Sequence, residues 1–113
     1  MDTIIRETLR PFGITRNYRG YPQTVRAIAL VLEDESRLLN VTEEIYEVVA
    51  LQTRCHPSNV ERNIRTVITV VWEQNRAMLE GLARRPLLQR PCAAQFLSIL
   101  SNSLLCEQRA GPV

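Results

Sequence analysis

The sequence lacks the residue spacings that mark metal sites and disulfide frameworks. It has one histidine and three cysteines, with no C-x-x-C spacing among them. An odd number of cysteines without paired spacing argues against a disulfide framework. Cys55 and His56 are adjacent, which is poor geometry for two ligands of one zinc ion, and no other paired ligands occur in the sequence. We therefore expect no metal and no cofactor.

Motifs of enzyme chemistry are also missing. The sequence has no Gly-rich phosphate loop and no G-x-S-x-G turn. A cysteine–histidine nucleophilic pair would have to use His56, for which the sequence offers no evident orienting partner. We therefore expect a protein that is not an enzyme.

Long apolar runs are absent as well. The longest wholly apolar run covers residues 27–32, whereas a membrane-spanning helix needs about 20 apolar residues. The N-terminal residues show no basic segment followed by an apolar stretch, so no secretory signal is evident. These absences favour a cytoplasmic protein without membrane contact. The chain of 113 residues is 45% hydrophobic and 23% charged, which predicts one folded domain over residues 1–113.

The chain contains no lysine, so all 14 basic residues are arginine, and 12 acidic residues leave a net charge of +2. This excess is too small to indicate a nucleic-acid ligand by itself. The planar guanidinium group does suit phosphates and guanine edges. A lineage bias in codon usage explains the absence of lysine at least as well, so the composition leaves both explanations open.

Helical periodicity and capping residues predict an all-α fold. The expected helices cover about residues 2–10, 22–36, 42–53, 58–75, 76–84 and 92–108, with loops at about 13–20 and 84–91. The residues expected on inner faces are Val25, Ile28, Ala29 and Leu32 in the second helix, Ile45, Val48, Val49 and Gln52 in the third, and Phe96, Ile99, Leu100 and Leu104 in the last.

The segment that begins at Ser58 is the most informative. Ser58 and Glu61 have the spacing of a capping box, which predicts that a helix begins at Ser58. The β-branched run 66–71 is also typical of a buried strand. However, a strand would place Arg62 and Arg65 on opposite faces, whereas a helix places both opposite one apolar stripe. The spacing therefore favours a helix with these inward residues: Val60, Ile64, Val67, Ile68 and Val71.

The predicted helices 42–53 and 58–75 have the size and connection of a helix-turn-helix. An α-helix fits the major groove of B-DNA, where Arg62 and Arg65 can pair with guanines and Glu61 can accept from cytosine. An ordinary solvated helix would carry the same charges, with Glu61 and Arg65 as an i,i+4 ion pair. The turn also lacks the usual glycine, so periodicity alone leaves both interpretations open.

Residues 58–65 resemble the recognition-helix signature of the C-terminal effector domain of the sporulation stage-zero protein A family. The shared pattern is a serine, Val-Glu-Arg, one variable residue and Ile-Arg, and the resemblance covers roughly residues 12–106. Further similarities occur at Gly20 and Tyr21, Arg26 to Ile28, Thr42, Tyr46, Trp72, Pro91 and Phe96.

This resemblance implies a six-helix bundle that contains a helix-turn-helix and binds double-stranded DNA, often as tandem copies. Glu61, Arg62 and Arg65 fall on the base-reading positions of the family. The positions associated with the DNA backbone are occupied by Ser58, Asn59 and Thr66, the last two of which replace basic residues. The resemblance also implies contact with an RNA polymerase sigma subunit through the stretch 73–85.

The departures from the family pattern reduce the expected grip on phosphates. We expect the chain to lack the receiver domain of the full-length family protein. Leu51 and Gln52 replace two lysines, and nearby glutamates add negative charge. Each lost phosphate contact lowers the salt slope by about 0.9, although Arg54 at the turn can restore one. The sequence thus predicts a specific but weak DNA binder, or one that needs a neighbouring copy.

Two functions remain open at this point. The first is a sequence-specific DNA-binding transcription regulator that acts in sporulation and uses the helix beginning at Ser58. The second is a helical protein-interaction module that modulates a sigma subunit or a full-length relative without productive DNA binding.

Overall fold

The computed structural model describes residues 2–13 and 20–109, which form helices and no strand. The all-α fold class is thereby confirmed for this part of the chain, and the loop predicted at 14–19 lies outside it. The elements in chain order are α1 (Asp2–Leu9), η1 (Arg10–Phe12), α2 (Gly20–Glu33), η2 (Glu35–Asn40), η3 (Thr42–Tyr46), α3 (Glu47–Thr53), α4 (Pro57–Ala83) and α5 (Ala93–Arg109). Both η1 and η2 are 3-10 helices, and η3 is a π-helical turn that leads directly into α3.

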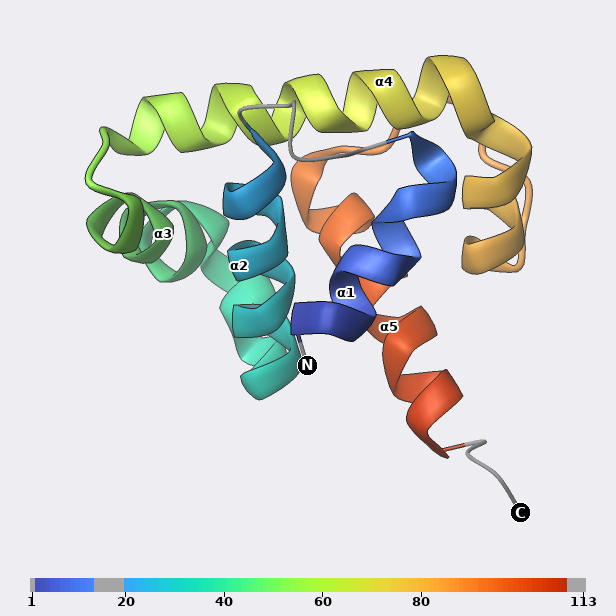
Figure 1. Ribbon diagram of the computed structural model, residues 1–113, viewed down its shortest axis with the longest axis horizontal. Helices are drawn as coiled ribbons and strands as arrows, with labels where there is room; N and C mark the ends of the chain where they lie inside the picture. Colours follow the sequence, from blue (N-terminus) through green and yellow to red (C-terminus); the bar gives the residue numbers. More distant parts are fainter. Residues whose placement is uncertain (1, 14–19, 110–113) are drawn as a thin grey trace.

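The long helix α4 extends across one side of the molecule, and the other helices lie beneath it (Figure 1). Helix α3 lies under the N-terminal end of α4, while α1, α2 and α5 lie under its middle. Helix α2 packs against both α4 and α5 and so forms the centre of the bundle. Within the described residues, no helix is long and apolar enough to cross a membrane.

Burial confirms the helical interpretation of the segment 58–75. The five inward residues predicted there are all buried and belong to α4, including the β-branched stretch that is also typical of strands. Full burial of one aliphatic side chain contributes about 1.5–3 kcal/mol. This gain exceeds the few tenths of a kcal/mol by which β-branched residues disfavour a helix, so packing decides the conformation.

Helix α4 continues through the predicted boundary at Asn75 but bends there. Asn75 has non-helical backbone angles (φ −144°, ψ 47°), and its side-chain amide donates to the carbonyl oxygen of Pro11 at 3.4 Å. The sequence therefore predicted the position of the break correctly. It did not predict that the two helical segments join at Asn75 without a loop between them. With the two segments of α4 counted separately, the fold is the predicted six-helix bundle with a helix-turn-helix.

Helix α2 is shorter than predicted, because it ends at Glu33 rather than near residue 36. Asp34 is extended, and its Oδ1 accepts hydrogen bonds from the Ser36 amide at 3.0 Å and the Ser36 hydroxyl at 2.6 Å. These two hydrogen bonds lower the pKa of Asp34 below its ordinary value, and the bond from the hydroxyl has the larger effect. An aspartate in this position caps the next element, so a new 3-10 helix begins instead of a longer α2.

The inner face of α3 is rotated relative to the prediction. Ile45 and Val49 are buried as expected and Val48 is half-buried, but Gln52 is exposed. Its side-chain oxygen accepts from Arg26 at 3.5 Å. Ala50 is buried in its place because that side of the helix faces α4 and α2. Helical spacing permits either stripe, and only the positions of the neighbouring helices decide between them.

The inner face of α5 agrees closely with the prediction, whereas that of α2 agrees in part, because Ala27, Leu30 and Val31 are also buried. In α2, Val25 and Ile28 are buried, while Ala29 and Leu32 are half-buried against the core. In α5 the four predicted residues are all buried, and Leu97 joins them: Phe96, Leu97, Ile99, Leu100 and Leu104.

Candidate nucleic-acid interface

The turn between α3 and α4 is built without glycine. Arg54 closes α3 in the left-handed conformation (φ 56°, ψ 51°), and its amide donates to the carbonyl oxygen of Ala50. This conformation is the one that glycine adopts most readily at the end of a helix. The missing glycine therefore does not prevent a helix-turn-helix here, because Arg54 adopts the left-handed conformation in place of a glycine.

Helix α4 begins one residue before the predicted capping box. His56 is extended (φ −81°, ψ 143°), and its Nδ1 accepts from the Ser58 amide at 3.2 Å, with Pro57 in the first helical position. The prediction that Ser58 caps the helix is wrong. A residue before proline is biased towards the extended region, and proline suits the first position of a helix. This pair moves the cap to His56 and places Ser58 inside the first turn.

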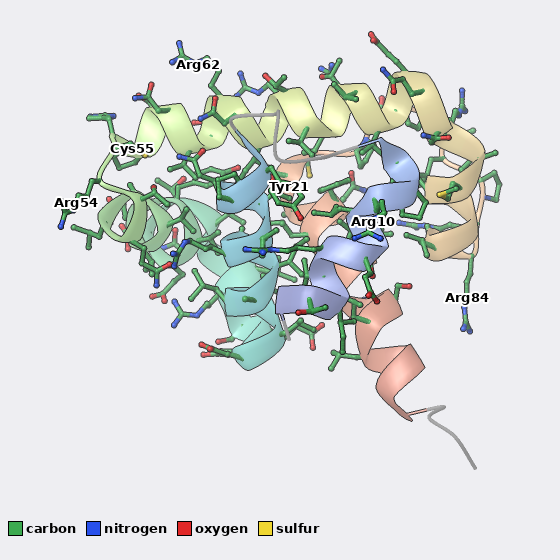
Figure 2. All side chains as sticks on the ribbon, in the orientation of Figure 1. Arg10, Tyr21, Arg54, Cys55, Arg62 and Arg84 are labelled. Carbon is green, nitrogen blue, oxygen red and sulfur yellow. The ribbon has the colours of Figure 1, made fainter. Side chains whose placement is uncertain are left out.

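The three predicted base-reading residues lie together in the N-terminal half of α4. Arg62 is exposed and projects away from the bundle, as Figure 2 shows, and it donates to Asn59 Oδ1 at 2.8 Å. Arg65 donates to Glu61 Oε1 at 2.6 Å, and the two side chains are 61% and 47% exposed. The i,i+4 ion pair between Glu61 and Arg65 that the sequence suggested is thus present. Arg62 and Arg65 each use one guanidinium nitrogen in these contacts, and their other N–H groups are free to bind a ligand.

The residues predicted to contact the DNA backbone differ in how free their donors are. Thr66 Oγ1 donates to the carbonyl oxygen of Arg62 at 3.0 Å, and Ser58 Oγ lies 2.8 Å from His56 Nδ1. Both hydroxyls therefore already have partners, that of Thr66 within α4 and that of Ser58 at the N-cap of the helix. Asn59 keeps its amide N–H groups free because only its oxygen is used. Arg54 is exposed at the turn, some way along the molecule from Arg62 (Figure 2).

A half-buried polar network fixes the turn and α4 against α2, and sequence patterns did not indicate it. Gln23 in α2 accepts from Asn63 Nδ2 at 2.9 Å and donates to Cys55 Sγ at 3.2 Å. Thr53 Oγ1 lies 3.2 Å from the same sulfur. Cys55 thus serves as a hydrogen-bond partner that ties the turn to the bundle. The one feature of the sequence that points to this network is Gln23, a polar residue on the buried face of α2.

Two further arginines contact side chains of α4, Arg90 from the connection to α5 and Arg76 from within α4 itself. Arg90, predicted to lie in a solvated connection, donates to Thr69 Oγ1 at 2.9 Å and so reaches the outer face of α4. Arg76 stacks on Trp72, with its guanidinium carbon 4.3 Å from the ring centroid. Trp72 is half-buried and packs against the core. Nothing in the sequence spacing linked Arg90 to residue 69, because the two belong to separate elements.

The arrangement suits recognition of a polyanion and offers no grouping for metal chemistry in the part of the chain that the structure describes. One rigid helix buries its apolar stripe and presents arginines outward, and a second helix precedes it across a short turn. This combination places the molecule among helix-turn-helix proteins.

The comparison with known families agrees with this class. Residues 5–104 match the family described as sporulation initiation factor Spo0A C terminal, which spans nearly the whole chain. The chain belongs to this family, as the resemblance in the sequence predicted. The family consists of DNA-binding regulator domains and is not a catalytic one, so the chain is assigned to DNA binding and transcription regulation in sporulation.

Proposed function

We propose that this chain is a sequence-specific transcription regulator that inserts the N-terminal half of α4 into the major groove of DNA. The observation that supports this most directly is the exposure of Arg62 and Arg65 on one side of a helix whose opposite side is buried. Each guanidinium group can form a bidentate pair with O6 and N7 of guanine. Glu61 orients Arg65 and is available to accept from the exocyclic amine of cytosine.

The DNA backbone is contacted by Ser58, Asn59, Thr66 and Arg54 in this proposal. Arg54 makes the strongest of these contacts, because it carries a full charge and its side chain is exposed at the turn. The hydroxyls of Ser58 and Thr66 must exchange their internal partners for phosphate oxygens. The resulting grip is weak for one copy, so two copies on adjacent sites bind together as a tandem dimer.

Selection of bound duplexes from a random pool, followed by anisotropy titration, tests the proposal. Arg65→Ala is expected to cost about 1–3 kcal/mol of binding free energy and to relax the preference at one base position. Arg85→Ala is the matched control, since Arg85 is exposed in the connection between α4 and α5. Equal affinity and equal base preference of the wild type and Arg65→Ala would refute major-groove recognition by α4.

One observation favours the second candidate function, a protein-interaction module. Leu39 in η2 and Leu51 in α3 are 90% and 82% exposed, and exposed glutamates occur in the same part of the chain at positions 35, 43, 44 and 47. A sigma subunit or a full-length relative with a basic, apolar groove would fit such a surface. Titration with either purified partner distinguishes the candidates. The interaction module would be favoured if the chain binds such a partner, if Leu51→Gln abolishes this binding, and if the chain binds no duplex selectively.

A further inference from the structure

An open cavity of about 710 Å³ lies beside α4, between the start of η3 and the segment that leads into α5. Its charged lining consists of Glu61, Arg65 and Arg90. Glu61 is bound to Arg65 at 2.6 Å, so these two charges largely compensate each other. No carboxylate pairs with Arg90 among the residues described. The cavity therefore has a net positive lining.

A buried tyrosine directs a hydrogen-bond donor into this cavity. Tyr46 is only 6% exposed and lines the cavity, and its hydroxyl makes no hydrogen bond to another group within the described part of the chain. The hydroxyl oxygen is not fully enclosed, so a group in the cavity can pair with it. Burial, and next the charge of Glu61, raises the pKa of Tyr46 above its ordinary value of 10.0. The phenol is therefore protonated at neutral pH and is able to donate.

The first turn of α5 provides additional donors at the same place. Ala93 and Ala94, the first two residues of this 17-residue helix, line the cavity. The first amides of a helix have no acceptor within the helix, and the helix dipole favours an anion in front of them. A phosphate group is the ligand that such a combination of amides, arginine and hydroxyl recognises.

On α4 the cavity is lined by Glu61, Arg65 and Ile68, so it adjoins the side of the helix that carries Glu61 and Arg65. Arg90 extends from the cavity lining to Thr69, which follows Arg62 by seven residues, or two helical turns. A duplex with α4 in its major groove has a sugar-phosphate strand along each side of the helix. With α4 inserted in this way, one of these strands would run along the side of α4 that carries Glu61 and Arg65, where the cavity lies.

We propose that this cavity holds one backbone phosphate of the bound duplex, contacted by the Tyr46 hydroxyl, the Arg90 guanidinium and the first amides of α5. The proposal rests on the proposed DNA-binding function and adds a charged contact that base reading does not require. It places part of the phosphate grip on the connection to α5, outside the helix-turn-helix. Tyr46 and Arg90 then raise affinity for all sequences equally and do not change base preference.

Titrations of one selected duplex over a range of salt concentrations test this proposal. Arg90→Gln is expected to lower the slope of log K against log salt by about 0.9, whereas Arg85→Gln leaves it unchanged. Tyr46→Phe is expected to weaken binding about three- to tenfold with the slope and the base preference intact. The bundle tolerates this change because the hydroxyl has no partner inside it. An unchanged slope for Arg90→Gln, or an unchanged affinity for Tyr46→Phe, would overturn the proposal.

Duplexes in which single phosphates are replaced by neutral methylphosphonates locate the contact. One replacement is expected to weaken the wild type but not Arg90→Gln, and the absence of any such position contradicts the proposal. Inorganic phosphate followed by amide chemical shifts separates the two possible failures. In one outcome, inorganic phosphate shifts the amide signals of Ala93, Ala94 and Tyr46, Arg90→Gln abolishes these shifts, and the protein binds no duplex selectively. The cavity is then a site for free phosphate, and the proposed DNA-binding function is wrong. In the other outcome, the protein binds a duplex selectively but Arg90→Gln and the methylphosphonate replacements have no effect. The phosphate site is then refuted, and the proposed DNA-binding function stands.

Discussion

At Gly20, the first residue of α2, the backbones of α2 and α4 approach so closely that no side chain fits between them. A Cβ atom at this position would lie 2.5 Å from the carbonyl oxygen of Asn63 and 2.9 Å from a methyl group of Val67. Asn63 also joins the hydrogen-bond network of the turn. The orientation of α4 therefore depends on the absence of a side chain at residue 20.

Gly20→Ala is expected to lower the free energy of unfolding by about 1–3 kcal/mol, because α4 must move away from α2. Gly81→Ala is the matched control, since a Cβ atom there meets nothing within 4 Å. It should instead stabilise the exposed end of α4 by up to about 1 kcal/mol. Urea denaturation of both variants measures the difference. Equal stability of Gly20→Ala and the wild type would show that α4 does not depend on this contact.

Arg54 and Arg84 both end a helix in the left-handed conformation, with φ angles of 56° and 59°. They lie towards opposite ends of the molecule (Figure 2). The left-handed region costs about 1 kcal/mol for a residue with a side chain, and glycine avoids this cost. Both arginines carry this strain, and the proposed phosphate contact assigns a ligand role to Arg54 alone.

Arg54→Gly and Arg84→Gly should each raise the free energy of unfolding by up to about 1 kcal/mol. Only Arg54→Gly should weaken DNA binding and reduce the salt slope by about 0.9. Thermal denaturation and duplex titration of the two variants provide the comparison. If both variants bind DNA as the wild type does, Arg54 has no contact with phosphate.

At the scale of elements, the beginning of α4 is determined by the His56-Pro57 pair and not by Ser58. Proline has no amide hydrogen to leave unsatisfied at the first position, and the imidazole Nδ1 takes the amide of Ser58. The imidazole accepts in this contact, so the proton of the neutral ring is placed on Nε2. The N-cap of the recognition helix is therefore His56, two residues before the Ser58 that a capping box would use.

His56→Ala is expected to lower the free energy of unfolding by about 1 kcal/mol, since it leaves an amide of the first turn without its acceptor. His56→Asn should retain most of this stability, because asparagine is a favoured helix cap. Ser58→Ala should cost less than about 0.5 kcal/mol, as expected for an exposed position without a capping role. A larger loss for Ser58→Ala than for His56→Ala, measured by denaturation, would restore Ser58 as the cap.

At the scale of the whole molecule, the small net charge hides an uneven distribution. The outer face of α4 and the adjoining connection carry arginines, whereas η3 and α3 carry glutamates at 43, 44 and 47. All three glutamates are exposed, and Glu44 is paired with Arg37 at 3.4 Å. The largest extent of the molecule is 40 Å. At about 0.01 M salt the Debye length is about 30 Å, which is comparable with this extent, so the glutamates of η3 and α3 repel a bound duplex over much of the molecule.

Replacement of Glu43 and Glu47 together by glutamine raises the net charge by two, from +2 to +4. We expect DNA binding to tighten about two- to fivefold at about 0.02 M salt and to return to the wild-type value near 0.3 M. Leu51→Gln, which changes no charge on the same helix, serves as the control. Titrations that show no gain at low salt would mean that α3 lies outside the electrostatic reach of the duplex.

The sequence by itself determined the all-α fold, the ranges of most helices and the identity of α4 as the outward arginine helix. Periodicity carries this information because burial of one face of a helix depends only on residues three and four apart. The family signature at residues 58–65 likewise lies on consecutive positions, so it was visible without coordinates.

Only the tertiary structure decided which residues surround α4. The contacts of Gln23 with Cys55 and Asn63, of Gly20 with α4 and of Arg90 with Thr69 join elements that are separate in the sequence. The exposed position of Gln52 and the position of Tyr46 in the lining of the cavity have the same origin. Local periodicity does not specify how two helices approach each other, because side-chain volume and packing across the whole bundle set that geometry.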